Sequence, residues 1–340
     1  MATVTADTEV LDESAWQERL DSLSGYSFFA TPSWGRVLSG AGLGYQHQAF
    51  EFDADGQRAL LPLVFRKDIV GRLIFQSGAF GTYGALIPLD AQGERSWPSL
   101  GAAAARRLLA MSGFGILIAY PGPRQHVPLP TVFDHYTAYV IDLRSQLTDG
   151  DAVTVTGMRR KTRQYIHKAE RDGVEVKPEE SIAAFEAYYG LLVASARRWG
   201  RANPGKHWTV FESIQHNSEP GSVLLWLARV HGQPAAGLLC FYGKGEVFAW
   251  SAALDEQYVG TRANYLLHWR AIADAATRGF ETFNLGANER LEGVRWFKEG
   301  FGAKASAYPA YVVATMPYAA AVLGFQGLRR IQNALRSIRA

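Results

Sequence analysis

A run of cations is the first feature that could do chemistry. Between Arg159 and Arg171 the sequence RRKTRQYIHKAER holds six Lys or Arg residues and one carboxylate. Several of them lie four residues apart, which puts them on shared faces of a helix, where like charges cost about 0.2–0.5 kcal/mol per pair. A helix that only faces water usually carries carboxylates between its cations. The pattern therefore favours an anionic partner, either a phosphorylated substrate or an RNA backbone, over a plain solvated face.

Lys298, in the stretch RWFKEG, is the second candidate. An ammonium aimed at the oxyanion of an acyl transfer lowers the barrier by about 2.7–4 kcal/mol. The alternative is a surface lysine on a short amphipathic helix. The sequence has no Gly-x-Ser-x-Gly elbow, and its histidines lack companions at metal-ligand spacing. We therefore expect no metal and no bound cofactor, and direct attack of an amine on an activated acyl group.

Length and composition indicate a globular protein of two domains. The chain has 340 residues, 48% of them hydrophobic, and a formal charge of +3, which is too small to indicate nucleic-acid binding by itself. Its one cysteine, Cys240, lies in the apolar run GLLCFYG, so we expect it to fill the core. The N-terminus resembles no signal peptide and no apolar run could span a bilayer, which predicts a cytoplasmic protein.

The second half shows a clear order of elements. Helical patterns over 159–173 and 181–200 enclose a short strand, VEVKP, and a loop rich in Gly and Pro follows. Three antiparallel strands come next, SVLLWLARV, PAAGLLCFY and EVFAWSAAL. The order ends with a helix over 263–279, the strand FETFNLG, a short helix around Lys298 and the strand ASAYPAYVV.

The first half repeats this plan loosely. A short helix capped by Thr31 precedes a hairpin, YQHQAFEFD and QRALLPLVF, closed at ADG. The strand RLIFQ, a helix over 99–113 and the strands FGILIAY and HYTAYVIDL complete it. We predict domains over residues 1–145 and 150–314, and a basic amphipathic helix over 315–340.

The element order resembles the GNAT acyltransferase fold, and the chain as a whole resembles the FemABX family of tandem GNAT-like aminoacyl transferases. The features that carry this resemblance are VIDL followed by the basic helix, the segment YLLHWRAIADAATRGFETFNLG, and FKEGF as a Phe-Lys-x-x-Phe motif. It implies an α+β fold of two GNAT-like domains with mixed, mostly antiparallel sheets. In each, the acyl donor enters where the sheet splays after its fourth strand.

The resemblance also implies substrates and residue roles. The donor would be aminoacyl-tRNA and the acceptor an amine on a peptidoglycan precursor carried by UDP or lipid. Lys298 would stabilise the transition state, and Trp250 would line the acceptor site. The basic helix head would hold acceptor phosphate through Lys161, Thr162 and Arg163, beside Arg159 and Arg160.

Three departures from the family pattern are visible. A lysine that some members carry four residues after the first-domain tryptophan falls at Leu38, and Arg36 is the nearest basic substitute. Asn284 stands where the family often has Asp. The coiled-coil arm of some members is absent. These differences weaken the case for a UDP-linked acceptor and remove one tRNA contact.

Two loops have alternative interpretations. DEQYVGTRAN precedes a helix where acyl-CoA-dependent GNATs cradle pyrophosphate on loop N–H groups, but Arg262 replaces the final small residue. The loop is thus either a broken CoA cradle or a plain turn. FQSGAFGTYGA ends a first-domain strand, and it is either a simple turn or the lining of an interdomain cleft, with Tyr83 presenting its hydroxyl.

The C-terminal stretch AVLGFQGLRRIQNALRSIRA pairs an apolar side with four arginines. It fits either a tail helix packed on the second domain or a helix at the inner face of an anionic membrane.

We therefore expect an acyltransferase that forms an amide, with aminoacyl-tRNA as co-substrate. An acyl-CoA-dependent N-acyltransferase and a non-catalytic binder of RNA or anionic membrane are the alternatives. Donor, acceptor, general base and oligomeric state stay open.

Overall fold

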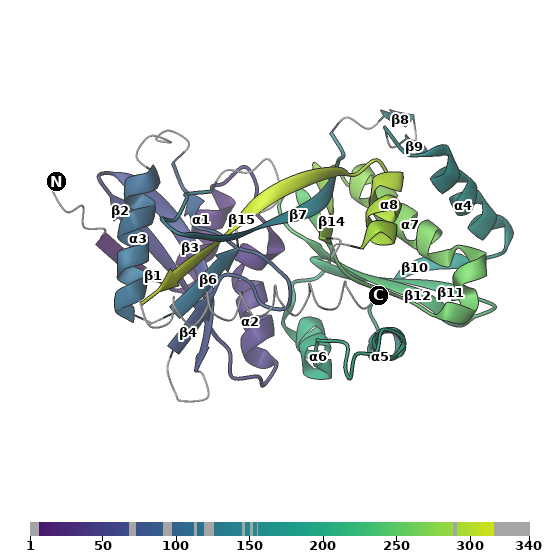
Figure 1. Cartoon of the computed structure of the whole chain (residues 1–340), viewed down its shortest axis with the longest axis horizontal. Coiled ribbons are helices and arrows are strands. Elements are labelled where there is room, and N and C mark those ends of the chain that lie inside the picture. The colour runs from purple at the N-terminus through teal and green to yellow at the C-terminus, as the bar shows by residue number, and fades with distance from the viewer. Residues whose placement is uncertain are drawn as a thin grey trace, which may run out of the picture.

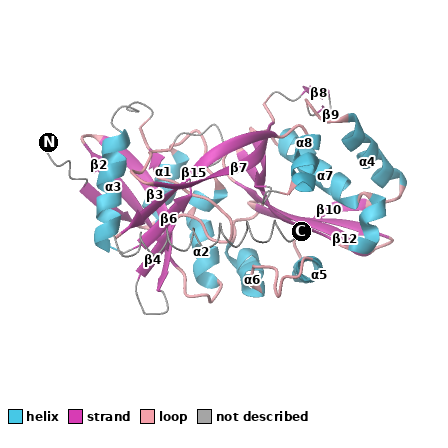
Figure 2. Cartoon of the chain, viewed as in Figure 1, coloured by secondary structure: helices cyan, strands magenta, loops and turns pink. Residues whose placement is uncertain are grey.

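The computed structural model describes residues 7–67, 73–90, 97–111, 114–118, 126–144, 147–149, 152–154, 156–287 and 291–315. One 13-stranded sheet runs through this part of the chain in the order β1-β2-β3-β4-β6-β15-β7-β14-β13-β12-β11-β10, with β5 paired to β3 (Figure 1). Helices cover both faces of the sheet (Figure 2). The predicted α+β class with a mixed, mostly antiparallel sheet is confirmed.

The first half supplies one end of the sheet and the helices around it. Its elements are β1 (Asp7–Leu11), α1 (Glu13–Asp21), η1 (Phe28–Ala30), α2 (Pro32–Gly40), β2 (Gln46–Ala54), β3 (Gln57–Lys67), β4 (Leu73–Gln76), β5 (Ile87–Pro88), α3 (Trp97–Met111), β6 (Phe114–Ile118) and β7 (Val132–Asp142). The α2 helix begins as predicted, because the Thr31 hydroxyl accepts a hydrogen bond from Trp34 N and Pro32 follows the cap.

The second half supplies the other end. After the short hairpin β8 (Leu147–Asp149) and β9 (Ala152–Thr154), its elements are α4 (Arg160–Arg171), β10 (Glu175–Glu179), α5 (Ile182–Arg198), α6 (Trp208–Asn217), β11 (Val223–Val230), β12 (Gln233–Tyr242), β13 (Glu246–Leu254), η2 (Glu256–Thr261), α7 (Ala263–Thr277), β14 (Thr282–Ala287), α8 (Glu292–Gly300) and β15 (Lys304–Ala314). The predicted elements occur in the predicted order, and β8, β9, α6 and η2 occur in addition.

The two halves exchange their last strands. β7 pairs with β14 of the second half, with Phe283 opposite Ile141, and β15 pairs with β6 of the first half, with Val312 opposite Ile116. β7 and β15 also pair with each other, and Figure 1 shows them side by side between the two ends of the sheet. The predicted division between residues 145 and 150 stays a prediction, and the pairing shows that the sheet is continuous across it.

A shared core lies between the halves. Trp34 of α2, Phe211 of α6 and Phe241 of β12 are all buried in one cluster, with ring centroids of Trp34 and Phe241 5.5 Å apart. A second cluster joins α4 and α7 to the opposite face of the same strands, and buried Cys240 belongs to it, as predicted. In Figure 1, α5 and α6 lie on one side of these strands and α4, α7 and α8 on the other.

Some elements were not anticipated from sequence. No element was assigned to residues 208–217, where α6 forms because His207 caps it and Val210, Phe211 and Ile214 are buried. The predicted C-terminal helix falls outside the described residues. Within the part of the chain that the structure describes, no helix is both long enough and apolar enough to cross a bilayer.

Replacing Gly243 with alanine tests the contact between the halves. A Cβ there would meet the Tyr26 carbonyl and lie 2.7 Å from Phe28 N, both backbone atoms of the first half. We expect Gly243→Ala to lower the free energy of unfolding by about 1–3 kcal/mol, measured by urea unfolding. Gly190→Ala on α5, where nothing lies within 4 Å, is the control and should be neutral or stabilising. Equal stability of the two variants would contradict this packing.

Candidate functional site

The centre of the site is the point at which β13 and β14 stop pairing. These parallel strands pair from Glu246 opposite Thr282 to Phe248 opposite Asn284, and no pairing between them is seen beyond. β13 continues to Leu254 and β14 to Ala287. We call residues 249–254 and 285–287 the splay. Along the splay the facing edges of β13 and β14 do not pair with each other.

Lys298 of α8 lies at the splay. Its side chain is buried, and Nζ donates hydrogen bonds to the carbonyl oxygens of Leu285 at 2.5 Å, Gly286 at 3.0 Å and Ala287 at 2.6 Å. Three carbonyls therefore meet the three protons of the ammonium. The alternative of a surface lysine is wrong. Direct contact with an oxyanion would require exchanging one of these carbonyls, whereas a through-space charge effect would not.

Aromatic rings fix the position of α8, the helix that carries Lys298. Phe297 and Phe301, which flank it in the Phe-Lys-x-x-Phe motif, have centroids 5.1 Å apart, and both contact His268 of α7. Gly286 adopts a φ of 69°, which glycine tolerates and which turns its carbonyl toward Nζ. The Asn284 side chain supports this turn, because its Oδ1 accepts a hydrogen bond from Gly286 N at 2.8 Å.

His268 is a buried residue that the sequence analysis did not single out. Its Nδ1 is 2.8 Å from the Asn264 carbonyl, so Nδ1 carries the proton and Nε2 does not. Burial lowers the pKa of His268 to about 4, and the positive charge of Lys298 contributes in the same direction. The imidazole is therefore neutral at pH 7. The scattered histidines gave no signal for this position, because only the fold brings it beside the motif.

The basic run forms the head of α4, and a second helix head lies beside it. Tyr165 of α4 contacts Tyr265 of α7 with centroids 4.8 Å apart, and Glu170 is 3.3 Å from Arg270 further along both helices. The helices are therefore parallel and in step, with both N-termini at the same end. The N-cap residues of the two helices, Arg159 and Arg262, make no side-chain cap hydrogen bond.

Cations gather around these two heads. Lys161 Nζ lies 5.1 Å and the Arg262 guanidinium 4.5 Å from the centroid of the Tyr165 ring. Arg160 and Arg163 are exposed on the first turn of α4. We call Arg160, Lys161, Arg163 and Arg262, with the heads of α4 and α7, the anion seat. Sequence singled out the three α4 cations, and the fold adds Arg262.

The remaining residues of the basic run have structural contacts. Arg159 pairs with Glu299 at 2.7 Å and lies over Trp296, which joins α4 to α8. Thr162 is fully buried against Gly300, so close that a Cβ at Gly300 would lie 2.5 Å from its Oγ1. The structure thus places the Thr162 hydroxyl in the packing between these helices and away from the exposed surface of the head.

Trp250 and Arg36 lie between the two halves. Trp250 is buried, donates from Nε1 to the Phe80 carbonyl at 3.0 Å, and has Lys206 Nζ 4.7 Å from its ring. Arg36 bridges Glu13 of the first half at 2.6 Å and Glu219 of the second at 2.7 Å. Trp250 lies within the splay on β13, and its ring packs in the core between the halves. Arg36 shows no hydrogen bond or ion pair to the splay or to the anion seat among the described residues.

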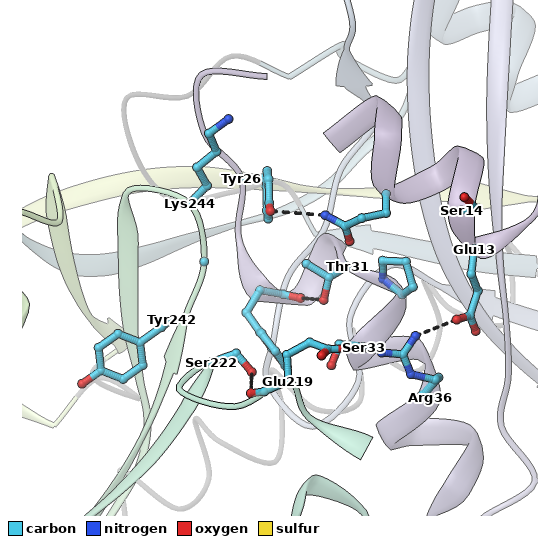
Figure 3. A pocket seen from close by; sticks show the side chains of 14 residues that line it. Glu13, Ser14, Tyr26, Thr31, Ser33, Arg36, Glu219, Ser222, Tyr242 and Lys244 are labelled. Carbon is cyan, nitrogen blue, oxygen red and sulfur yellow. Dashed lines mark hydrogen bonds and ion pairs between the residues drawn. The ribbon is translucent and has the colours of Figure 1, made fainter. Parts of the chain in front are cut away.

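Arg36 borders a pocket of about 600 Å³ between the halves (Figure 3). The cations of this pocket already have partners, because Lys244 Nζ donates to the carbonyls of Asp21 at 3.0 Å and Leu23 at 2.7 Å. Glu13 is partly buried, yet hydrogen bonds from His47 and Arg36 hold its pKa below the usual value. The pocket is therefore a balanced set of ion pairs that joins the halves, and it shows less preference for an anion than the seat does.

Tyr83 presents its hydroxyl to a buried group rather than to an open cleft. The hydroxyl donates to Glu246 Oε1 of β13 and accepts from Asn284 Nδ2 at 3.1 Å. Burial raises the pKa of Glu246 to about 8, although hydrogen bonds from Tyr83 and Asn284 act to lower it. Glu246 is thus a largely protonated carboxyl at pH 7, located at the root of the splay. No grouping of three or more possible metal ligands occurs among the described residues.

Comparisons with known proteins agree with this geometry. Residues 156–298 match the acetyltransferase (GNAT) domain family. No curated protein sequence is significantly similar to the chain. Among solved structures, that of FemX aligns with a TM-score of 0.67 at 11% identity, covering 89% of this chain and 96% of the FemX chain.

Two further structures share the fold. L-PGS from Bacillus licheniformis aligns with a TM-score of 0.53 at 14% identity, over 93% of this chain and 96% of that one. A tandem GNAT protein from the clavulanic acid biosynthesis pathway gives 0.53 at 11% identity, over 90% and 98%. Identities this low establish the fold, and the matched domain supplies the class of enzyme. The chain is an acyltransferase with a FemABX-like GNAT fold.

Proposed function

We propose that this acyltransferase moves an aminoacyl group from aminoacyl-tRNA to an amine on a small acceptor of the peptidoglycan-precursor type. The observation that carries the proposal is the anion seat. Two parallel helix heads and four cations lie on one side of a sheet whose strands part at the splay. A donor with a phosphate backbone and a reactive ester at its end matches that arrangement.

The electrostatics of the anion seat favour the binding of a phosphate group. Each helix head carries a partial positive charge of about half an elementary charge, and no side-chain cap bond is made at the head of α4. Lys161 and Arg262 approach the same Tyr165 ring from two helices. An anion that contacts both cations would offset the repulsion between their charges.

The loop before α7 supports an RNA donor over acyl-CoA. Acyl-CoA enzymes of this fold hold pyrophosphate on free N–H groups of this loop. Here Gln257 N is bonded to Asp255 Oδ1 at 3.0 Å, Arg262 N to the Val259 carbonyl at 3.3 Å, and Ala263 N to Thr261 Oγ1 at 3.3 Å. These donors are satisfied within the loop. Phosphate would instead meet the cationic side chains.

The chemistry is direct aminolysis. The lone pair of a neutral acceptor amine attacks the ester carbonyl, the C–O bond to the terminal ribose breaks, and the ribose oxygen leaves with the proton that the amine loses. The ammonium of Lys298 places one positive charge at the splay, where negative charge develops on the carbonyl oxygen. His268 is neutral there and can accept a hydrogen bond at Nε2.

An acyl-CoA-dependent N-acyltransferase is the second candidate. The matched domain family is named for acetyltransferases, and one solved neighbour is described as a tandem GNAT protein studied without AcCoA. A non-catalytic binder of RNA or of anionic membrane has less support, since the splay with a buried lysine has no role in it. Another solved neighbour is described as a putative lysylphosphatidylglycerol synthetase, which favours a lipid-linked or otherwise phosphate-bearing acceptor here.

The first prediction concerns Lys298. In single-turnover reactions of charged tRNA with muropeptide amines, followed by mass spectrometry, we expect Lys298→Met to reduce the rate of amide formation about 100-fold. Lys304→Met, an exposed lysine on β15, is the matched control and should react as the wild type does. A Lys298→Met enzyme as fast as the wild type would remove the ammonium from the mechanism.

The second prediction concerns the anion seat. Inorganic pyrophosphate, titrated by calorimetry, should bind about tenfold more weakly to Lys161→Ala and to Arg262→Ala, as expected for the loss of one charged hydrogen bond. Lys177→Ala, exposed on β10, should bind as the wild type does. Equal affinities for all four proteins would show that phosphate binds elsewhere or not at all.

The third prediction separates the two donors. Charged tRNA should raise the melting temperature in a salt-dependent manner, whereas CoA at the same concentration should not. Stabilisation by CoA alone, with acetyl transfer to an amine, would establish the second candidate in place of the first.

A further inference from the structure

A buried hydrogen-bonded chain crosses from the first half to the splay. Tyr83, in the loop after β4, donates its hydroxyl proton to Glu246 Oε1 at the start of β13. The same hydroxyl oxygen accepts from Asn284 Nδ2 of β14 at 3.1 Å. Tyr83, Glu246 and Asn284 are each 2% exposed or less. Most polar side chains buried this completely have hydrogen-bond partners.

The series of hydrogen bonds continues from Asn284 to Lys298. Asn284 Oδ1 accepts from Gly286 N at 2.8 Å, and the Gly286 carbonyl accepts from Lys298 Nζ at 3.0 Å. Gly286 has a positive φ, so its peptide orientation depends on what holds its N–H and its carbonyl. Asn284 holds one side of that residue and Lys298 the other. A change at Glu246 or Tyr83 is therefore passed to Lys298 through a single backbone turn.

The packing around Tyr83 and Glu246 excludes water and disfavours a buried charge. The Tyr83 ring lies 5.3 Å from Phe29 and 5.2 Å from Phe248, both edge-on. Glu246 Oε2 is buried and has no hydrogen-bond donor among the described residues. An ionised carboxylate in that position would leave one oxygen bare in an apolar site, which costs more than keeping the proton.

We propose that Tyr83, Glu246 and Asn284 form a positioning unit that holds the end of β14, and through it Lys298, in the geometry needed for acyl transfer. This inference rests on the proposed function. In this proposal Glu246 touches no substrate and acts on Lys298 only through Asn284 and Gly286. Through Tyr83, the unit makes the first half necessary for positioning Lys298 of the second half.

The groups that act on Glu246 define what its titration reports. Tyr83 and Asn284 contact it, and Ser27 reaches it through Tyr83. Lys244, on the turn before β13, directs Nζ to the carbonyls of Asp21 and Leu23. Burial raises the pKa of Glu246 from 4.5 to about 8. Raising the pH through about 8 should therefore ionise Glu246 and disturb the unit.

Glu246→Gln isolates this titration, because glutamine has the shape of the protonated carboxyl and cannot ionise. The ratio of the wild-type kcat to the Glu246→Gln kcat cancels the titration of the acceptor amine, which both enzymes share. We expect this ratio to be constant up to pH 7 and to be about tenfold lower at pH 9. The reason is that only about one tenth of Glu246 is still protonated one pH unit above its pKa. KM should be unchanged.

Hydrogen exchange of the Gly286 amide gives a readout that does not need activity. Its protection factor should fall about tenfold between pH 7 and 9 in the wild type and stay constant in Glu246→Gln. Tyr83→Phe should lower protection at every pH. The matched control is Tyr311→Phe, another buried tyrosine, whose hydroxyl is hydrogen-bonded to His126, and it should leave Gly286 unchanged.

The pH dependence of the free energy of unfolding tests the raised pKa of Glu246. The unfolded chain releases the Glu246 proton near pH 4.5 and the folded chain near pH 8. The free energy of unfolding of the wild type, relative to Glu246→Gln, should thus fall as pH rises through this window and level off above it.

Two results would overturn the positioning unit: a ratio of kcat that does not change with pH, or Gly286 protection that is equal in Tyr83→Phe and Tyr311→Phe. If the wild type transfers no aminoacyl group while Gly286 responds as expected, the proposed function fails and the hydrogen-bonded unit stands.

Discussion

The ammonium of Lys298, bound to three carbonyls at the end of β14, is the interaction on which the site depends. It places one buried positive charge where the sheet opens, and it ties α8 to the strand that forms one edge of the opening. A lysine in an apolar setting would lose its proton or be displaced, but three acceptors at hydrogen-bond distance stabilise the charged form. The aromatic residues Phe297 and Phe301 then limit the movement of the helix that carries it. The contact that places this charge is therefore also the contact that fixes α8 on β14.

The exchange of β7 and β15 explains why two similar halves act as one protein. Each half completes the sheet of the other, so neither strand order closes without the partner half. The core between them is built from rings of both halves, and ion pairs such as Arg36 with Glu219 add to the same boundary. The anion seat lies entirely on second-half helices, whereas Tyr83 comes from the first half. Under the proposed function, the second half therefore binds the donor, and the first half helps to position Lys298 through Tyr83.

The spacing of apolar residues, with the glycine and proline residues between elements, was enough to predict most helices and strands of the second half. The same reasoning could not predict which strands pair across the halves, since β7 and β15 contact partners more than 100 residues away. Among site residues, the cations of α4 stood out by charge alone. Arg262, His268 and Glu246 did not, because their roles come from neighbours that only the fold supplies. The hydroxyl of Thr162 could bind phosphate, but the rotation of α4 about its own axis turns this hydroxyl toward α8.

The most direct test is a structure of the protein with a non-hydrolysable analogue of the aminoacylated 3′ end of tRNA. The account predicts that the acyl carbonyl lies at the splay within a few ångströms of Lys298, and that a phosphate contacts Lys161 or Arg262. An analogue bound with its carbonyl away from the splay, for example in the pocket bordered by Arg36 and Lys244, would contradict it.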